Sequence, residues 1–118
     1  MNEREFKQRT KDVGLRVIRV VEALPATKTA DVIGRQVLRS ATSVGANYRA
    51  SCRAKSTADM IAKLSIVEEE GDETLYWLEL LVEAGLVSEG RLRKLMADLD
   101  EVVAMVVASI RTLRRRKR

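Results

Sequence analysis

Hydrophobic residues recur every three or four positions along most of the chain, which is the spacing of one face of an α-helix. The first such stripe begins at Phe6 and ends at Leu24, directly before Pro25. Since the residue before a proline avoids helical backbone angles, we expect the first helix to end there. The last stripe extends from Leu92 to Leu113. These periods predict a chain made of helices.

Capping signals divide the pattern into four segments. Ser56 precedes Asp59 by three residues, which is a capping-box spacing, and Gly85 occupies a position where helices commonly stop. Short joints between long helices favour an all-α, antiparallel up-down four-helix bundle. We therefore expect one domain over residues 1–113 with helices at about 3–24, 29–53, 57–84 and 89–113, followed by a basic C-terminal tail over 114–118.

The third helix carries a second apolar face, nearly opposite the face that Leu64, Leu75 and Leu78 present to the core. A bundle buries one stripe per helix, so a second stripe holding the only tryptophan predicts contact with another subunit. The expected oligomer interface contains Ile66, Glu73, Tyr76, Trp77 and Leu80.

Glu73 lies in the middle of that second face. A carboxylate there is costly if it is buried without a partner. Two arrangements are open: an arginine from the second helix or from a neighbouring subunit pairs with Glu73, or Glu73 stays hydrated at an interface rim.

The second helix has a polar row beside its core stripe. Small polar side chains at such spacing permit close helix approach and hydrogen bonds between helices, and they also suit a ligand or nucleic-acid surface. For Arg39 we favour pairing with the acidic residues of the third helix. The polar seam consists of Gln36, Arg39, Ser40, Ser43 and Asn47.

Positive charge is concentrated in two places. The net charge is +5, and most of the excess lies in residues 28–58 and in the C-terminal run, whereas residues 59–110 are acidic. Lysine and arginine side chains on a surface bind phosphates of RNA or DNA in a salt-dependent way. The residues expected to contact nucleic acid are Arg35, Arg49, Arg53, Arg111, Arg114, Arg115, Arg116, Lys117 and Arg118.

Enzymatic chemistry has little support. The chain has no histidine and one cysteine, Cys52, which removes Ser-His-Asp and Cys-His arrangements and the common metal ligand. We expect no enzyme activity, no cofactor, no metal site and no structural disulfide. No apolar run is long enough to span a membrane, and no signal core is present, so we expect a cytoplasmic protein without membrane contact.

Several blocks resemble the "four helix bundle protein" family, which includes proteins encoded by intervening sequences in bacterial 23S ribosomal RNA genes. Residues 39–50, preceded by Gln36, are similar to the most recognisable block of that family. Residues 54–56, 63–66 and 73–81 are similar to a second block. The resemblance covers nearly the whole chain. The sequence departs from the family pattern at Arg49 or Ala50, at Met60 and over residues 68–70. These departures change the surface charge more than they change the core.

This resemblance implies a bundle that assembles into a ring, often a pentamer. Accessory proteins of diversity-generating retroelements share the architecture more distantly, and they bind a reverse transcriptase and nucleic acid through basic surfaces. Two functions follow. One is a non-enzymatic homo-oligomer that accompanies RNA or DNA through its basic surfaces. The other is a scaffold that recruits a protein partner, such as a reverse transcriptase, without touching nucleic acid.

Overall fold

The computed structural model describes residues 2–117, without the side chain of Lys117. Within that range the chain is helical and has no strand, which confirms the expected all-α chain with four helices. Arg118 and the side chain of Lys117, both expected to contact nucleic acid, lie outside the described residues. The helices are α1 (Glu3–Glu22), α2 (Lys28–Ser51), α3 (Thr57–Glu83) and α4 (Glu89–Lys117).

The helix ends follow local capping chemistry. The hydroxyl of Ser56 accepts a hydrogen bond of 3.0 Å from the backbone N–H of Asp59 at the start of α3. Thr27 does the same for Ala30 at the start of α2, at 3.1 Å. After α3, Gly85 adopts a φ of 75°, a left-handed conformation that side chains with a Cβ disfavour.

The fourth helix is longer than expected. Its regular structure continues past Leu113 to Lys117, so residues 114–117 form the end of α4 instead of a separate tail. The expected boundary marked the end of the apolar stripe. Arginine is a good helix former, and cations suit the negative end of the helix dipole, so the helix continues without further core contacts.

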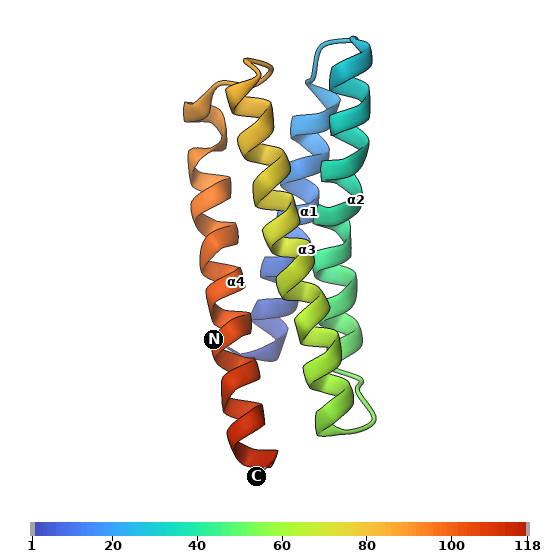
Figure 1. Ribbon diagram of the computed structural model, residues 1–118, viewed down its shortest axis with the longest axis vertical. Helices are drawn as coiled ribbons and strands as arrows, with labels where there is room; N and C mark the ends of the chain where they lie inside the picture. The colour runs from blue at the N-terminus through green and yellow to red at the C-terminus, as the bar shows by residue number, and fades with distance from the viewer. Residues whose placement is uncertain (1, 118) are drawn as a thin grey trace.

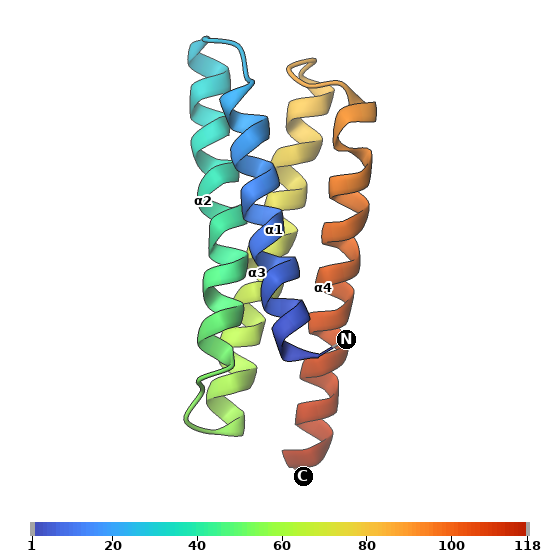
Figure 2. The ribbon, with the colours of Figure 1, turned by 180° about the vertical axis from the view of Figure 1, so that it is seen from behind.

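The chain turns back at each short loop, so that α1 lies beside α2, α2 beside α3 and α3 beside α4 (Figure 1). The described residues form an elongated body of 50 × 22 × 22 Å. In Figure 1 α3 lies nearest the viewer and α1 lies behind; Figure 2 shows the reverse side, with α1 in front. These two helices therefore face opposite sides of the bundle.

The core consists of two groups of side chains stacked along the bundle. Val37, Leu78 and Leu99 are completely buried in the first group, and Val44 and Val106 are completely buried in the second. Aliphatic side chains supply nearly all of this surface, since apolar burial is the main favourable term in folding. One aromatic pair closes the second group, where the rings of Phe6 and Tyr48 meet edge to face with centroids 4.6 Å apart.

Candidate functional site

A network of charged and polar side chains joins α2 to α3. The guanidinium of Arg39 pairs with Glu73 and lies 3.2 Å from Glu70. The indole Nε1 of Trp77 donates a hydrogen bond of 3.0 Å to the same Glu73 carboxylate. The Trp77 hydrogen bond, together with Arg39, lowers the pKa of Glu73. Of the two arrangements open for Glu73, the structure thus shows an arginine from the second helix.

The rest of the polar seam also serves helix contact. The Thr74 and Ser40 hydroxyls lie 2.9 Å apart between α3 and α2, and both side chains are completely buried. Asn47 donates to the Ser43 hydroxyl one turn earlier on its own helix, at 2.7 Å. Gln36 is half-buried. For Arg39, Ser40, Ser43 and Asn47 this arrangement corresponds to the structural interpretation of the seam, in which its polar groups find partners within the bundle.

The residues expected at an oligomer interface divide into two kinds. Trp77 and Leu80 are partly buried and pack against the core of their own chain. Ile66 and Tyr76 remain exposed, at 40% and 54%. The helical pattern placed all five residues on one face, but it could not show that the large Trp77 side chain reaches back to the bundle.

Most of the predicted nucleic-acid-binding residues gather at one end of the molecule. Figure 1 shows the ends of α2 and α4, together with the start of α1, at the lower end of the bundle. Arg49 lies in the last turn of α2, and Arg53 lies in the turn that follows it. A pocket of about 420 Å³ is lined by both Cys52 and Arg116, so the ends of α2 and α4 border the same pocket. We call this region the basic end; its predicted residues are Arg49, Arg53, Arg111, Arg114, Arg115 and Arg116.

These six arginines are exposed, and none of them takes part in a salt bridge within residues 2–117. Arg35 is different. It pairs with Asp31 at 3.2 Å, and it lies about 21 Å along α2 from Arg49 at 1.5 Å per residue. The structure therefore does not bring Arg35 together with the other predicted residues.

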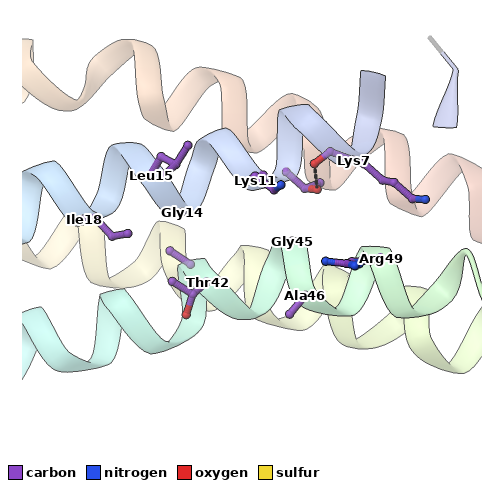
Figure 3. A pocket seen from close by; sticks show the side chains of 11 residues that line it. Lys7, Lys11, Gly14, Leu15, Ile18, Thr42, Gly45, Ala46 and Arg49 are labelled. Carbon is purple, nitrogen blue, oxygen red and sulfur yellow. Dashed lines mark hydrogen bonds between the residues drawn. The ribbon is translucent and has the colours of Figure 1, made fainter. Parts of the chain in front are cut away.

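The sequence interpretation missed a groove between α1 and α2. It has a volume of about 590 Å³ and is lined by Lys7 and Lys11 from α1 and by Arg49 from α2, with no acidic residue among its walls (Figure 3). Leu15 and Ile18 continue the same wall and are exposed, at 42% and 38%. The sequence did contain a signal for this groove. Lys7, Lys11, Leu15 and Ile18 are spaced four, four and three residues apart, which places them on one face of α1, away from its core stripe.

The structure also places the groups considered for other chemistry. Burial is the main cause that raises the pKa of the Cys52 thiol, which keeps it protonated and a poor nucleophile. Burial likewise raises the pKa of Tyr48. In the described part of the chain, no group of three or more acidic or cysteine side chains is arranged to hold a metal ion. No helix there has the length and apolar character needed to cross a membrane.

Comparison with known proteins gives a family. The model of the 23S rRNA-intervening sequence protein family matches residues 2–108. No curated protein matches the sequence. A crystal structure at 1.70 Å resolution, of a protein with unknown function from the S23 ribosomal protein family of Bacteroides thetaiotaomicron VPI-5482, is similar with a TM-score of 0.87 and 32% sequence identity. The match covers 94% of this chain and 99% of that chain. The chain therefore belongs to the family of 23S rRNA-intervening sequence proteins.

Proposed function

We propose that this protein is a non-enzymatic, antiparallel up-down four-helix bundle that forms a ring-like homo-oligomer and binds RNA or DNA through its basic end. The observation that carries the nucleic-acid part is the convergence of two helix ends. Arg49 from α2 and Arg53 from the turn after it lie at the same end as Arg114, Arg115 and Arg116 from α4. Six exposed arginines without acidic partners among the described residues form a surface suited to phosphate groups.

The binding mode we propose is electrostatic. The two aromatic side chains nearest this end, Phe6 and Tyr48, pack against each other in the core, so they offer no open platform on which bases could stack. Contacts to the phosphate backbone give weak sequence preference and a strong dependence on salt. The family resemblance supports a ring of five copies, and the exposed Ile66 and Tyr76 on α3 supply apolar surface for contacts between copies.

A gel-shift titration tests this function. The probes are a structured RNA and a DNA duplex of equal length, at low and at moderate salt. We expect the chain to retard both, and replacement of Arg114, Arg115 and Arg116 by glutamine to weaken binding by roughly tenfold or more at low salt, because about three phosphate contacts are lost. Glutamine keeps the helix propensity close to that of arginine.

The matched control lies on the same helix. Arg91, Arg93 and Lys94 are three cations at the other end of α4, and changing them to glutamine removes the same charge. We expect this control variant to bind nearly as well as the native chain. Equal losses in both variants would show that only net charge matters, and no retardation by the native chain at low salt would exclude the proposed function. In that case a protein partner that stays bound after nuclease treatment would favour the alternative scaffold.

A further inference from the structure

The groove between α1 and α2 has the chemistry of a receptor for an acidic, partly apolar helix. Lys7, Lys11 and Arg49 make one part of it cationic, and Leu15 and Ile18 make the adjoining part apolar. The helices approach closely beneath it, since a Cβ on Gly45 would lie 3.3 Å from the carbonyl oxygen of Thr10. The floor of the groove is thus made of small residues and backbone, which leaves room for side chains from outside.

The outer face of α3 has the complementary chemistry. Ile66, Glu69 and Tyr76 are exposed and lie at spacings of three and seven residues, which places them on one stripe of the helix. We call this stripe the α3 ridge. It combines two large apolar side chains with a carboxylate that forms no salt bridge within the described residues. The helix that carries the ridge, α3, lies on the other side of the bundle from α1, which supplies one wall of the groove (Figures 1 and 2).

The α3 ridge and the α1–α2 groove lie at the same height along the bundle, which follows from the contacts that α1 and α3 each make with α2. Gly14 of α1 is opposite Thr42, because a Cβ on Gly14 would lie 3.7 Å from the Thr42 Cα. Ser40 of α2 is opposite Thr74 of α3, with hydroxyls 2.9 Å apart. Because the rise per residue is the same in each helix, these two levels also align the remaining residues. Lys11 is then level with Glu69, and Ile18 is level with Tyr76.

The direction of the helices agrees with this alignment. Both α1 and α3 start at the lower end in Figure 1 and run upwards. In a ring whose axis follows the long axis of the bundle, all copies point the same way, so α3 of one copy runs parallel to α1 of the next. The spacing from cation to apolar residue on α1, Lys11 to Ile18, equals the spacing from Glu69 to Tyr76 on α3.

We propose that the α3 ridge of one copy docks in the α1–α2 groove of the next, with Glu69 facing Lys11 and Tyr76 facing Ile18. This proposal rests on the assembly part of the proposed function and names its two surfaces. A contact between different surfaces is heterologous, and it closes into a ring only when successive copies are not displaced along the axis. The equal levels of ridge and groove meet that condition.

A helix from a second copy fits the groove better than a phosphate chain does. Exposed Leu15 and Ile18 form part of the groove's wall, and a phosphate backbone gains nothing from apolar surface. The ridge offers a carboxylate for the cationic part of the groove and apolar side chains for the adjoining part. Complementary charge at such a contact mainly sets partner choice and register.

Charge reversal tests the pairing, with mass measured by light scattering and sedimentation velocity. In the variant Lys11→Glu every contact opposes two carboxylates, and in Glu69→Lys it opposes two ammonium groups. We expect each change to raise the concentration at which the assembly dissociates by roughly tenfold or more. The chain carrying both changes restores opposite charges at every contact and should assemble as the native chain does. Asp100→Lys, at an exposed position on α4, is the control and should assemble normally.

The outcomes separate this proposal from the function on which it rests. A native chain that is a monomer overturns both. A native chain that assembles, with Lys11→Glu and Glu69→Lys assembling equally well, overturns the docking alone. A Lys11→Glu variant that keeps its mass but no longer retards RNA also overturns the docking and assigns the groove to nucleic acid. Far-UV circular dichroism shows whether each single variant is folded, and recovery in the doubly changed chain shows that the loss came from the opposed charges.

Discussion

Trp77 donates its indole N–H to the carboxylate of Glu73, one turn earlier on α3, at 3.0 Å. This bond links the only tryptophan of the chain to the pair formed by Glu73 and Arg39. Trp77 is therefore a reporter for the contact between α2 and α3. Its fluorescence responds to the state of that contact without an added label.

Glu73 should make the contact between α2 and α3 sensitive to acid. Because the pKa of Glu73 lies below its ordinary value of 4.5 in the folded chain, its contribution to stability is complete above pH 4.5 and is lost as pH falls through the lowered pKa. We expect the fluorescence of Trp77 to change in that acid range. In Glu73→Gln, which has no proton to gain, the step should be absent. The same acid step in Glu73→Gln would show that another carboxyl group causes it.

Gly71 lies where α3 packs closely against α4. A Cβ on Gly71 would lie 2.6 Å from Cγ2 of Val103, so Gly71→Ala must displace a packed side chain. We expect a loss of about 1–3 kcal/mol in the free energy of unfolding, although alanine favours helices. Gly71→Ala combined with Val103→Ala should recover part of that loss. Gly90→Ala, where the added Cβ would point into open space, is the control and should leave urea denaturation unchanged or slightly favour the folded state.

The loop between α3 and α4 depends on a left-handed residue, Gly85. Gly85 has a φ of 75° and open space around the position of a Cβ, so backbone strain alone decides the effect of a substitution there. We expect Gly85→Ala to cost about 1–2 kcal/mol and Gly85→Asn to cost less, since asparagine tolerates this conformation. Thermal unfolding followed by circular dichroism measures both. Equal stability of all three chains would argue against the left-handed turn.

Truncation of Leu99 and truncation of Leu15 should have different effects. Leu99 is completely buried, whereas Leu15 is 42% exposed. We expect Leu99→Ala to lower the free energy of unfolding by about 2–5 kcal/mol, because it leaves a cavity in the core. Leu15→Ala should change stability by at most about 0.5 kcal/mol while weakening the assembly, since Leu15 lies in the proposed docking groove. If Leu99→Ala were a monomer and yet melted as the native chain does, Leu99 would act at the contact between copies and not in the core, which would contradict this prediction.

Much of the fold could be predicted because each helix carries its own signals. The stripe from Leu92 to Leu113 shows one buried face, and Ser56 with Gly85 marks both ends of α3. Such signals are local, because each of them lies within or next to the helix that it defines. The end of α4 was the exception, because arginines that continue a helix look the same in sequence as arginines in a tail.

The candidate sites were harder to predict because they depend on neighbours. Lys11 and Arg49 line one groove, yet they are far apart in the sequence and become neighbours only when α1 packs on α2. Trp77 was predicted at an intermolecular surface, because a helical wheel does not show how far a long side chain bends. Its hydrogen bond to Glu73 and its core contacts arise from packing, which periodicity does not record.

The arginines at the end of α4 affect the stability of its last turns. Arg114 and Arg115 lie three and four residues after Arg111, about one helical turn away, and like charges at that spacing repel each other. The last turns extend below the start of α1 (Figure 1), and none of these three exposed arginines forms a salt bridge within the described residues. A polyanion that neutralises these side chains removes the repulsion, so its binding and the winding of the final turns reinforce each other. Salt concentration and bound phosphate therefore both affect how fully these last turns of α4 are helical.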